Sequence, residues 1–404
     1  MNTPKYTKPF NIFLLMLPAG ISQGFVFVSL PYILTHNGFS VAQAAGIVAV
    51  AASASLFRFM LGPIVDVSLS LRKWYLLSTF AIITSLVALS FTPFTVEGGA
   101  FLSGIVFISQ LAVNTMFLPL GSFMAKSIDE KDKGKASGWY QGGGLAGTGL
   151  GGGAGLWLAE HYSAESSGAI LSIACLALAM VVFFLKDIQP EKGKTLVVEL
   201  KGLAKDLFSM IKVPITLFAI FLIIMPIGTG SMANLWSAIA DDWRVDADTV
   251  ALITGLLSGL ISALGCVAGG YIADRWGIWT AYLGSGAACA LITIIMALLP
   301  MQPFVYIGGV LFYAFTMGMI YAAFTSVLLF VIGKQHVATK FSIMGSLGNI
   351  SVVYMTSFDG WMHDMFNSKY MLLGEAFIGV TFIIIFYLIL SRMYGKKLVP
   401  IRVK

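Results

Sequence analysis

Charged residues are scarce in this chain of 404 residues, because Lys, Arg, Asp and Glu together make up only 11% of it. Soluble domains carry roughly 25% charged residues, so the composition excludes an ordinary soluble protein. Hydrophobic residues reach 58%, and the mean hydropathy is +0.87. These values are typical of a chain that lies mostly in a lipid bilayer.

Cysteine and histidine are rare as well, and neither forms a metal-binding pattern. Cys175, Cys266 and Cys289 all fall in apolar stretches, so they indicate buried thiols and not a disulfide framework. The four histidines are scattered, and no phosphate-binding motif of the G-x-x-x-x-G-K-[ST] type is present. The sequence therefore predicts no metal site, no cofactor and no enzymatic activity.

What the chain has in abundance is long apolar stretches, of which we count about twelve. Each approaches the roughly 20 residues that a membrane-spanning helix needs. They predict an all-α membrane protein with spans at 10–34, 42–66, 74–94, 100–124, 136–160, 167–186, 212–238, 248–273, 279–299, 303–329, 340–363 and 369–393.

The basic residues are distributed unevenly between the two sides of these spans. With the N-terminus inside, all but three of the 25 Lys and Arg fall on the cytoplasmic side; Arg244 and Lys369 fall outside, and Arg58 lies within a span. This positive-inside pattern predicts that both termini are cytoplasmic. We therefore interpret the basic residues behind the net charge of +6 as fixing the orientation in the membrane and contacting anionic lipid head groups. They do not indicate a nucleic-acid partner.

The longest polar stretch, 187–211, divides the chain into two parts. We expect a six-helix bundle at 1–186, a cytoplasmic linker at 187–211 with a short amphipathic helix over 196–211, a second six-helix bundle at 212–394, and a cytoplasmic tail at 395–404.

Landmarks of the two parts recur at one offset. Asp66 and Asp274 are 208 residues apart, as are Pro18 and Pro226 in matching Leu-Pro-x-Gly and Met-Pro-x-Gly phrases. A common register over some fifty residues indicates two homologous halves. In a chain this apolar, such halves favour a membrane transporter.

Two motifs carry a family resemblance. Gly270-x-x-x-Asp274-Arg275-x-Gly277 resembles the loop motif of the major facilitator superfamily, and the first half keeps Gly62, Asp66 and Arg72-Lys73. Arg58-Phe59-Met-Leu-Gly-Pro63-Ile-Val-Asp66 is similar to the signature of that superfamily's peptide/acetyl-CoA/drug transporter group, which includes anhydromuropeptide permeases and some siderophore importers. The resemblance implies two six-helix bundles related by pseudo-twofold symmetry, which work by alternating access.

The two aspartates are candidate gating residues, together with Gly62, Gly270, Arg72 and Arg275. A carboxylate at the cytoplasmic end of one helix can meet the positive N-terminal dipole of a neighbour or an arginine there. Such contacts form when the bundles close on the cytoplasmic side. The alternative is that each aspartate makes an ordinary turn at a helix end.

Ten glycines lie between Gly138 and Gly155 in the fifth span. In lipid a helix persists despite glycine, and the missing side chains permit very close packing. We interpret this stretch as a packing seam. The alternative is export, because Gly143 to Gly152 nearly matches the drug antiporter motif of the superfamily, with Thr148 in place of Pro.

Polar and aromatic residues at mid-membrane depth are the candidates for substrate binding, and the resemblance implies that the first and fourth helices of each half line the cavity. The alternative is that these side chains only join neighbouring helices. The candidates are Gln23, Arg58, Gln110, Asn114, Asn234, Trp236, Tyr313 and Tyr321.

Arg58 needs a partner inside the membrane, because an arginine at the bilayer centre costs about 2.5–3.5 kcal/mol on an insertion scale. That partner is either structural, such as Asp66 two turns along the same helix, or a carboxylate or phosphate of the substrate. The acids Asp359 and Glu375 are candidates for carrying a coupling proton; alternatively, Glu375 only snorkels or pairs.

Together these patterns predict a secondary transporter of the inner membrane that works by alternating access. It imports a mid-sized polar or amphipathic solute, muropeptide-, peptide- or siderophore-like, together with a proton. The alternatives are a drug or metabolite exporter and a transporter-like sensor or scaffold. The expected partners are a small-molecule substrate, a proton or other ion gradient and the lipid bilayer, and we expect a monomer.

Overall fold

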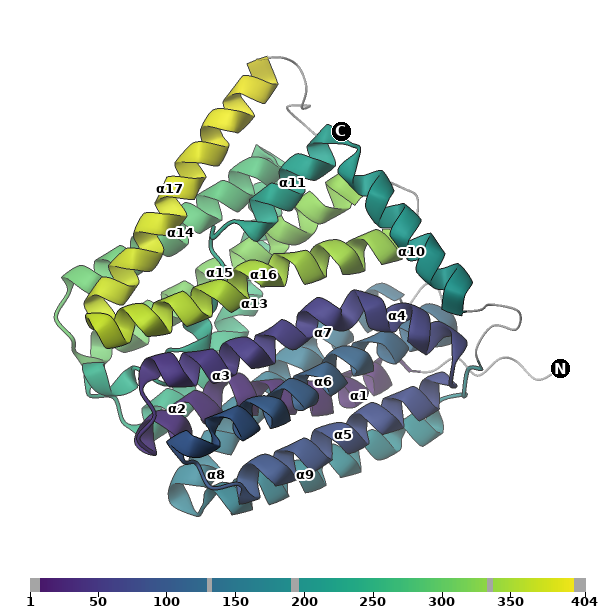
Figure 1. Ribbon diagram of the computed structural model, residues 1–404, viewed down its shortest axis with the longest axis horizontal. Helices are drawn as coiled ribbons and strands as arrows, with labels where there is room; N and C mark the ends of the chain where they lie inside the picture. The colour runs from purple at the N-terminus through teal and green to yellow at the C-terminus, as the bar shows by residue number, and fades with distance from the viewer. Residues whose placement is uncertain (1–7, 129–132, 190–195, 333–336, 396–404) are drawn as a thin grey trace. The chain divides into compact units, whose positions relative to one another are not determined.

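The computed structural model describes residues 8–128, 133–189, 196–332 and 337–395, and within these ranges the chain forms helices and turns with no strand (Figure 1). Nine helices in the described part are long and apolar enough to cross a membrane. The all-α architecture expected from the sequence is therefore confirmed.

The first half consists of helices joined by short loops, and the linker that follows contains the amphipathic helix α10 over the range expected for it. The elements of this part are α1 (Pro9–Gly24), η1 (Phe25–Ser29), α2 (Leu30–His36), α3 (Val41–Ser53), η2 (Ala54–Phe57), α4 (Arg58–Val67), α5 (Leu71–Phe91), η3 (Val96–Gly98), α6 (Gly99–Ser127), α7 (Lys133–Gly149), η5 (Leu150–Ala154), α8 (Gly155–His161), α9 (Ala164–Ala179), η6 (Met180–Phe184) and α10 (Leu196–Ile211).

The second half is less regular at its start. Its elements are α11 (Pro214–Ile224), η7 (Ser231–Asn234), η8 (Ala240–Trp243), α12 (Ala247–Val250), η9 (Ala251–Leu257), α13 (Ser258–Trp276), α14 (Ile278–Leu298), α15 (Pro303–Ile332), α16 (Val337–Met365) and α17 (Ser368–Gly395).

The chain packs into two compact units that do not follow the sequence halves strictly. The first contains Met1–Phe39, Val50–Leu200 and Ala247–Leu256. The second contains Ser40–Ala49, Lys201–Asp246 and Leu257–Lys404. Each unit thus includes a short segment from the other half of the sequence, 247–256 in the first unit and 40–49 in the second.

In the first unit the glycines of the fifth span let two helices touch through their backbones. A Cβ atom on Gly147 would lie 2.6 Å from the carbonyl oxygen of Leu17, and one on Gly151 would lie 1.9 Å from that of Ile21. Ser29 adds a hydrogen bond of 2.9 Å from its hydroxyl to the carbonyl of Gly152. The stretch is helical and packs closely, as interpreted from the sequence.

The same stretch has a second close neighbour in that unit. A Cβ on Gly255 would lie 2.5 Å from the backbone nitrogen of Gly153. Elsewhere in the unit, α5 and α9 lie side by side (Figure 1). Two helix backbones can touch directly only where the residues between them have no side chain, and glycine alone meets this condition. This requirement explains the many glycines of this span.

The second span begins with the capping box expected from its sequence. The backbone N–H of Ser40 donates to Oε1 of Gln43 at 2.9 Å, and the N–H of Gln43 donates to the Ser40 hydroxyl at 3.2 Å. Two amides that α3 cannot satisfy internally are therefore bonded.

The seventh span departs from the expectation. Residues 212–238 were expected to form one helix, but α11 ends at Ile224. Gly228 and Gly230 have φ values of 57° and 78°, which lie in the left-handed region and cannot continue a right-handed helix. The prediction that Asn234 and Trp236 lie on a transmembrane helix is therefore wrong, because they follow this break in a short 3₁₀ turn and the loop after it.

Candidate functional site

The second unit contains a buried carboxylate, Glu375 on α17, that is held by side chains from two other elements. Its Oε1 atom accepts hydrogen bonds from the Tyr313 hydroxyl on α15 at 3.1 Å and from the Ser231 hydroxyl in η7 at 3.3 Å. Its Oε2 atom is buried and has no partner in the described part of the chain. One oxygen of the carboxylate is thus anchored, and the other is available to a ligand.

The break in the seventh span is what brings Ser231 to Glu375. The Thr229 hydroxyl lies 3.0 Å from the Ser231 hydroxyl and accepts from the Ser231 backbone N–H at 3.2 Å. This local turn directs the side chain of Ser231 toward α17. A continuous helix would have used the Ser231 amide in its own hydrogen-bond ladder.

Asp359 on α16 is the second acid of this site. Its side chain is completely buried, and neither carboxylate oxygen has a hydrogen-bond partner among the described residues. It interacts electrostatically with Glu375 and lies close to Ser231. The two acids that the sequence singled out separately therefore belong to one cluster.

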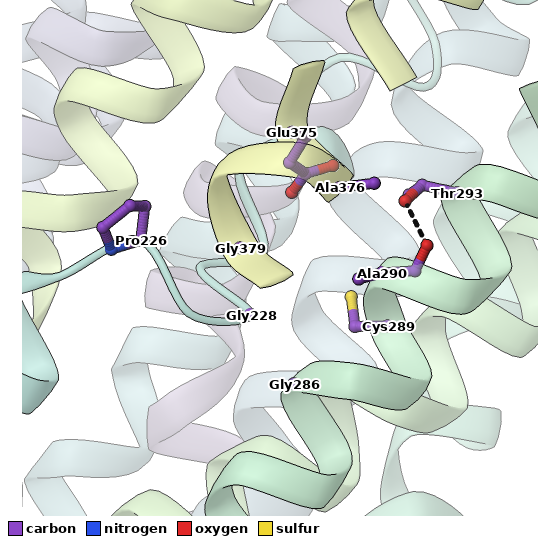
Figure 2. A pocket seen from close by; sticks show the side chains of 9 residues that line it. All are labelled: Pro226, Gly228, Gly286, Cys289, Ala290, Thr293, Glu375, Ala376 and Gly379. Atoms are coloured by element: carbon purple, nitrogen blue, oxygen red, sulfur yellow. Dashed lines mark hydrogen bonds between the residues drawn. The ribbon is translucent and has the colours of Figure 1, made fainter. Parts of the chain in front are cut away.

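A small pocket adjoins Glu375 and the broken span (Figure 2). Glu375 is the acidic residue in its wall, and α14 supplies much of the remainder. The lining residues are Pro226, Gly228, Gly286, Cys289, Ala290, Thr293, Glu375, Ala376 and Gly379.

Aromatic side chains pack beside the cluster. The ring of Trp236 meets the ring of Tyr313 edge-on, with 5.4 Å between centroids, and its backbone carbonyl accepts a hydrogen bond of 2.7 Å from the hydroxyl of Tyr306. Asn234 donates to the Thr356 hydroxyl at 3.1 Å. Trp236 and Tyr313 are thus buried supports of the site, whereas Tyr321, two turns further along α15, is exposed.

In the first unit the polar candidates lie between α1 and α6. Gln110 is 1% exposed and donates to the Ser22 hydroxyl at 3.3 Å, and Ser22 lies 2.8 Å from the Ser109 hydroxyl. Asn114 donates to the carbonyl of Gln110 on its own helix at 2.8 Å. Gln23 is partly buried. The contacts of Ser22 with Gln110 and Ser109 join α1 to α6, whereas Asn114 bonds within α6. Oε1 of Gln110 is buried and has no hydrogen-bond partner among the described residues.

Arg58 begins α4 and is partly buried among aromatic side chains. Its guanidinium lies over the ring of Phe117, 4.8 Å from the centroid, and interacts electrostatically with Tyr140 on α7. The rings of Phe117 and Tyr140 are 6.4 Å apart. Tyr140 could not be predicted from the sequence, because its contact with Arg58 depends on how α4, α6 and α7 pack.

The structure describes the helices of the gating candidates but only some of their side chains. Gly62 and Asp66 lie on α4, and Gly270 and Asp274 on α13, but the side chains of the two aspartates are outside the described residues. Arg72 donates to the carbonyl of Leu185 through its guanidinium, and its backbone N–H donates to Asp187 at 3.2 Å.

Arg275 makes its described contact within its own helix, where its guanidinium donates to the Tyr271 hydroxyl at 2.6 Å. Arg72, by contrast, ties the start of α5 to the end of η6. The two arginines therefore have different surroundings despite their similar places in the two motifs.

Asp242, in η8 outside the spans, belongs to a further polar cluster. It accepts hydrogen bonds from Nε2 of His363 at 2.9 Å and from the Ser368 hydroxyl. Partial burial tends to raise the pKa of Asp242, but these two hydrogen bonds and the nearby imidazole outweigh it and hold the pKa below its usual value. The cluster ties the loop before α12 to the adjoining ends of α16 and α17.

A helical chain with two compact units and two buried acids, Glu375 in an apolar span and Asp359 on α16, has the features of a membrane transporter. Residues 12–356 match the model of the Major Facilitator Superfamily. The chain belongs to this superfamily. No curated protein sequence matches it.

Solved structures of transporters share the fold over nearly the whole chain. A D-xylose–proton symporter has a TM-score of 0.73 at 16% identity, with 94% of this chain and 97% of that one covered. A mutant of the nucleoside transporter NupG gives 0.74 at 13% identity, covering 94% and 98%. A bacterial homologue of the human lysosomal transporter Spinster, inward-facing and unoccupied, gives 0.75 at 15% identity, covering 96% and 98%. At these identities the likeness shows the fold alone.

The sequence pointed to both acids and to Tyr313 as candidates, but not to Ser231, Thr229 or the break that places them. The signal was present as Gly228-Thr229-Gly230 directly after Pro226, inside an apolar stretch. An interrupted hydrophobic segment of this kind points to a binding site in transporters.

Proposed function

We propose that this protein is a proton-coupled secondary transporter of the inner membrane that imports a mid-sized polar or amphipathic solute by alternating access. Membership of the superfamily supports transport, and the Arg58-Phe59…Pro63…Asp66 signature supports a muropeptide-, peptide- or siderophore-like solute. The observation that carries the coupling is the pair Asp359 and Glu375, two acids buried together within spans.

The physical argument for a proton is electrostatic. Two carboxylates in a medium of low dielectric constant cannot both remain charged without a neutralising partner. The titratable groups that face the pair are Tyr313 on α15 and Cys289 on α14, and neither brings a positive charge. Protonation lowers the negative charge of the pair, and a conformational change that exposes the acids to the other side would release the coupling proton.

Both carboxylate oxygens of Asp359 and Oε2 of Glu375 are buried without a hydrogen-bond partner in the described part of the chain, which is a costly arrangement for a protein that moves nothing. This cost disfavours a scaffold or sensor. The glycines of the fifth span are accounted for by helix packing in the first unit, so the near-match to an antiporter motif gives no separate support to export.

Uptake into proteoliposomes tests the coupling. A panel of labelled anhydromuropeptides, short peptides and ferric siderophores would be offered under an imposed inward proton gradient, with and without a protonophore. We expect accumulation that the protonophore abolishes. Glu375→Gln and Asp359→Asn should lower gradient-driven accumulation at least tenfold while keeping counterflow exchange of the same solute, and the exposed Glu160→Gln should behave as wild type.

Accumulation that ignores the proton gradient, or that persists in both acid variants, would refute the coupling. Counterflow in vesicles of known orientation separates import from export, and outward accumulation would replace the importer by an exporter.

The proposed orientation places both termini in the cytoplasm, with a linker near 187–211 between the bundles 1–186 and 212–394. Reporter fusions at positions 97, 165, 245 and 366 should report the outside, and fusions at 130, 200 and 336 the cytoplasm. Reversal at two or more of these positions would overturn the orientation.

A further inference from the structure

The break in the seventh span lies at about half the depth of the membrane. α11 contains 11 residues before it ends at Ile224, which at about 1.5 Å per residue is roughly 16 Å of a hydrocarbon core about 30 Å thick. Backbone at this depth leaves the helical form only where protein or a ligand surrounds it, because lipid offers no hydrogen bonds.

Gly228 and Gly230 allow the chain to leave the helix at this break. Residue 230 lies in register with Ser22, which stays within the continuous helix α1, so the repeat does not require a break here. A Cβ on Gly230 would lie 2.3 Å from Cε of Met317 and would sit on a backbone with φ of 78°. The segment is therefore specific to the second half and is fixed by its residues.

Oxygen atoms of several kinds converge beside the break. They comprise Oε2 of Glu375 and both carboxylate oxygens of Asp359, none of which has a hydrogen-bond partner in the described part of the chain. The hydroxyl of Ser231 lies 3.3 Å from Oε1 of Glu375, and the hydroxyl of Thr229 lies 3.0 Å from that of Ser231. The C-terminal end of α11 adds the negative end of a helix dipole, which favours a cation.

We propose that Glu375, Asp359, Ser231 and Thr229, with the unwound backbone after α11, bind one sodium ion. This inference rests on the proposed function in that the same carboxylate pair carries the coupling proton. Oxygen ligands alone suit a hard cation and not a transition metal. Unwound backbone at a broken helix is a known way of coordinating sodium in transporters.

Charge balance sets the stoichiometry. The two carboxylates carry two negative charges, so one sodium ion and one proton neutralise them together. When sodium is absent, a second proton takes its place. Sodium and protons therefore compete for the pair, and the affinity for sodium falls as the pH is lowered.

Sodium binding would be measured on the full-length protein in detergent, using ²²Na⁺ in a scintillation proximity assay at pH 8.5 with choline as the balancing ion. We expect saturable binding of one sodium ion that excess unlabelled sodium displaces and potassium does not. Lowering the pH should raise the apparent Kd, by up to about tenfold per pH unit where one proton competes.

Variants locate the site. Glu375→Gln and Asp359→Asn should lose binding, and Ser231→Ala should weaken it at least threefold. Ser326→Ala removes a hydroxyl that bonds the backbone of its own helix and should bind as wild type. Gly230→Ala should lose binding, whereas Gly284→Ala, where a Cβ meets nothing within 4 Å, should keep it. If Gly230→Ala does not fold, the comparison of Ser231→Ala with Ser326→Ala still tests the site.

Absence of saturable ²²Na⁺ binding, equal displacement by potassium or by calcium, or full binding in both acid variants would overturn the sodium site. Proton-driven uptake in sodium-free choline buffer separates this inference from the proposed function. Uptake that persists without any sodium binding refutes the sodium site alone. Sodium binding by a protein whose uptake ignores the proton gradient refutes proton coupling alone.

Discussion

The guanidinium of Arg58 lies 4.8 Å from the centre of the Phe117 ring. This contact offers a cation the negative face of an aromatic ring, and Tyr140 supplies a polar neighbour. The ring face of Phe117 and the polar group of Tyr140 thus stabilise the positive charge of Arg58.

Arg58→Lys and Arg58→Gln distinguish a gating role from substrate binding. If Arg58 serves the gate, Arg58→Lys should keep most of the flux with an unchanged KM, and Arg58→Gln should slow transport like the gating variants below. If it binds substrate, Arg58→Gln should raise KM for anionic solutes by tenfold or more, about 1.4 kcal/mol, and leave neutral solutes unchanged. Normal kinetics of Arg58→Gln on every solute would dismiss both roles.

The paired aspartates of the loop motifs should control closure on the cytoplasmic side. Asp66→Asn or Asp274→Asn should leave the protein inserted but slow transport at least tenfold, about 1.4 kcal/mol, because a contact that favours the closed cytoplasmic side is weakened. Cysteine labelling from the periplasmic side should fall in both variants, because the contact stabilises the state that is open to the periplasm. Wild-type labelling together with wild-type flux would count against gating.

The glycine seam of the first unit should tolerate no side chain. Gly151→Ala places a Cβ 1.9 Å from the Ile21 carbonyl oxygen, so α1 and η5 must separate. We expect destabilisation of roughly 1–3 kcal/mol, seen as a lower melting temperature in detergent. Gly104→Ala on α6, where a Cβ meets nothing within 4 Å, is the matched control and should change stability by about 1 kcal/mol at most.

The Asp242 cluster should make stability sensitive to acid. The pKa of Asp242 is lower in the folded protein, so its contribution is fully present above the usual value of about 3.9 and is lost as the pH falls through the folded-state pKa. Asp242→Asn should therefore melt earlier than wild type at pH 6, and the difference should shrink below pH 4. The exposed Glu97→Gln should show no such convergence. A difference that is independent of pH would exclude this cause.

The sequence was a reliable guide where one local rule governs a segment. Apolar length fixes the spans, because a helix in lipid must bond its own backbone. Ser40 and Gln43 cap their helix through side chains three residues apart. The fifth span packs closely because its glycines carry no side chains, whatever their partner.

Pro18 and Pro226 show where sequence comparison reaches its limit. Both stand in x-Pro-x-Gly phrases 208 residues apart, yet Gly20 continues α1 whereas Gly228 takes a left-handed conformation. The difference lies in Gly230 and in the space that Met317 and Ile320 leave for the turn. The hydrophobic pattern alone could not show this, because the residues around the break remain apolar enough for a helix.

The sequence by itself determined that this chain spans a membrane as an all-helical protein of two related halves, since composition and register are properties of the chain alone. Tertiary structure decided which polar residues meet. Asp359 and Glu375 are 16 residues apart on separate helices, and Ser231 and Tyr313 are more distant still. Hydrogen bonds and charges act over a few ångströms, so only the packing of α15, α16 and α17 around the broken span joins them into one site.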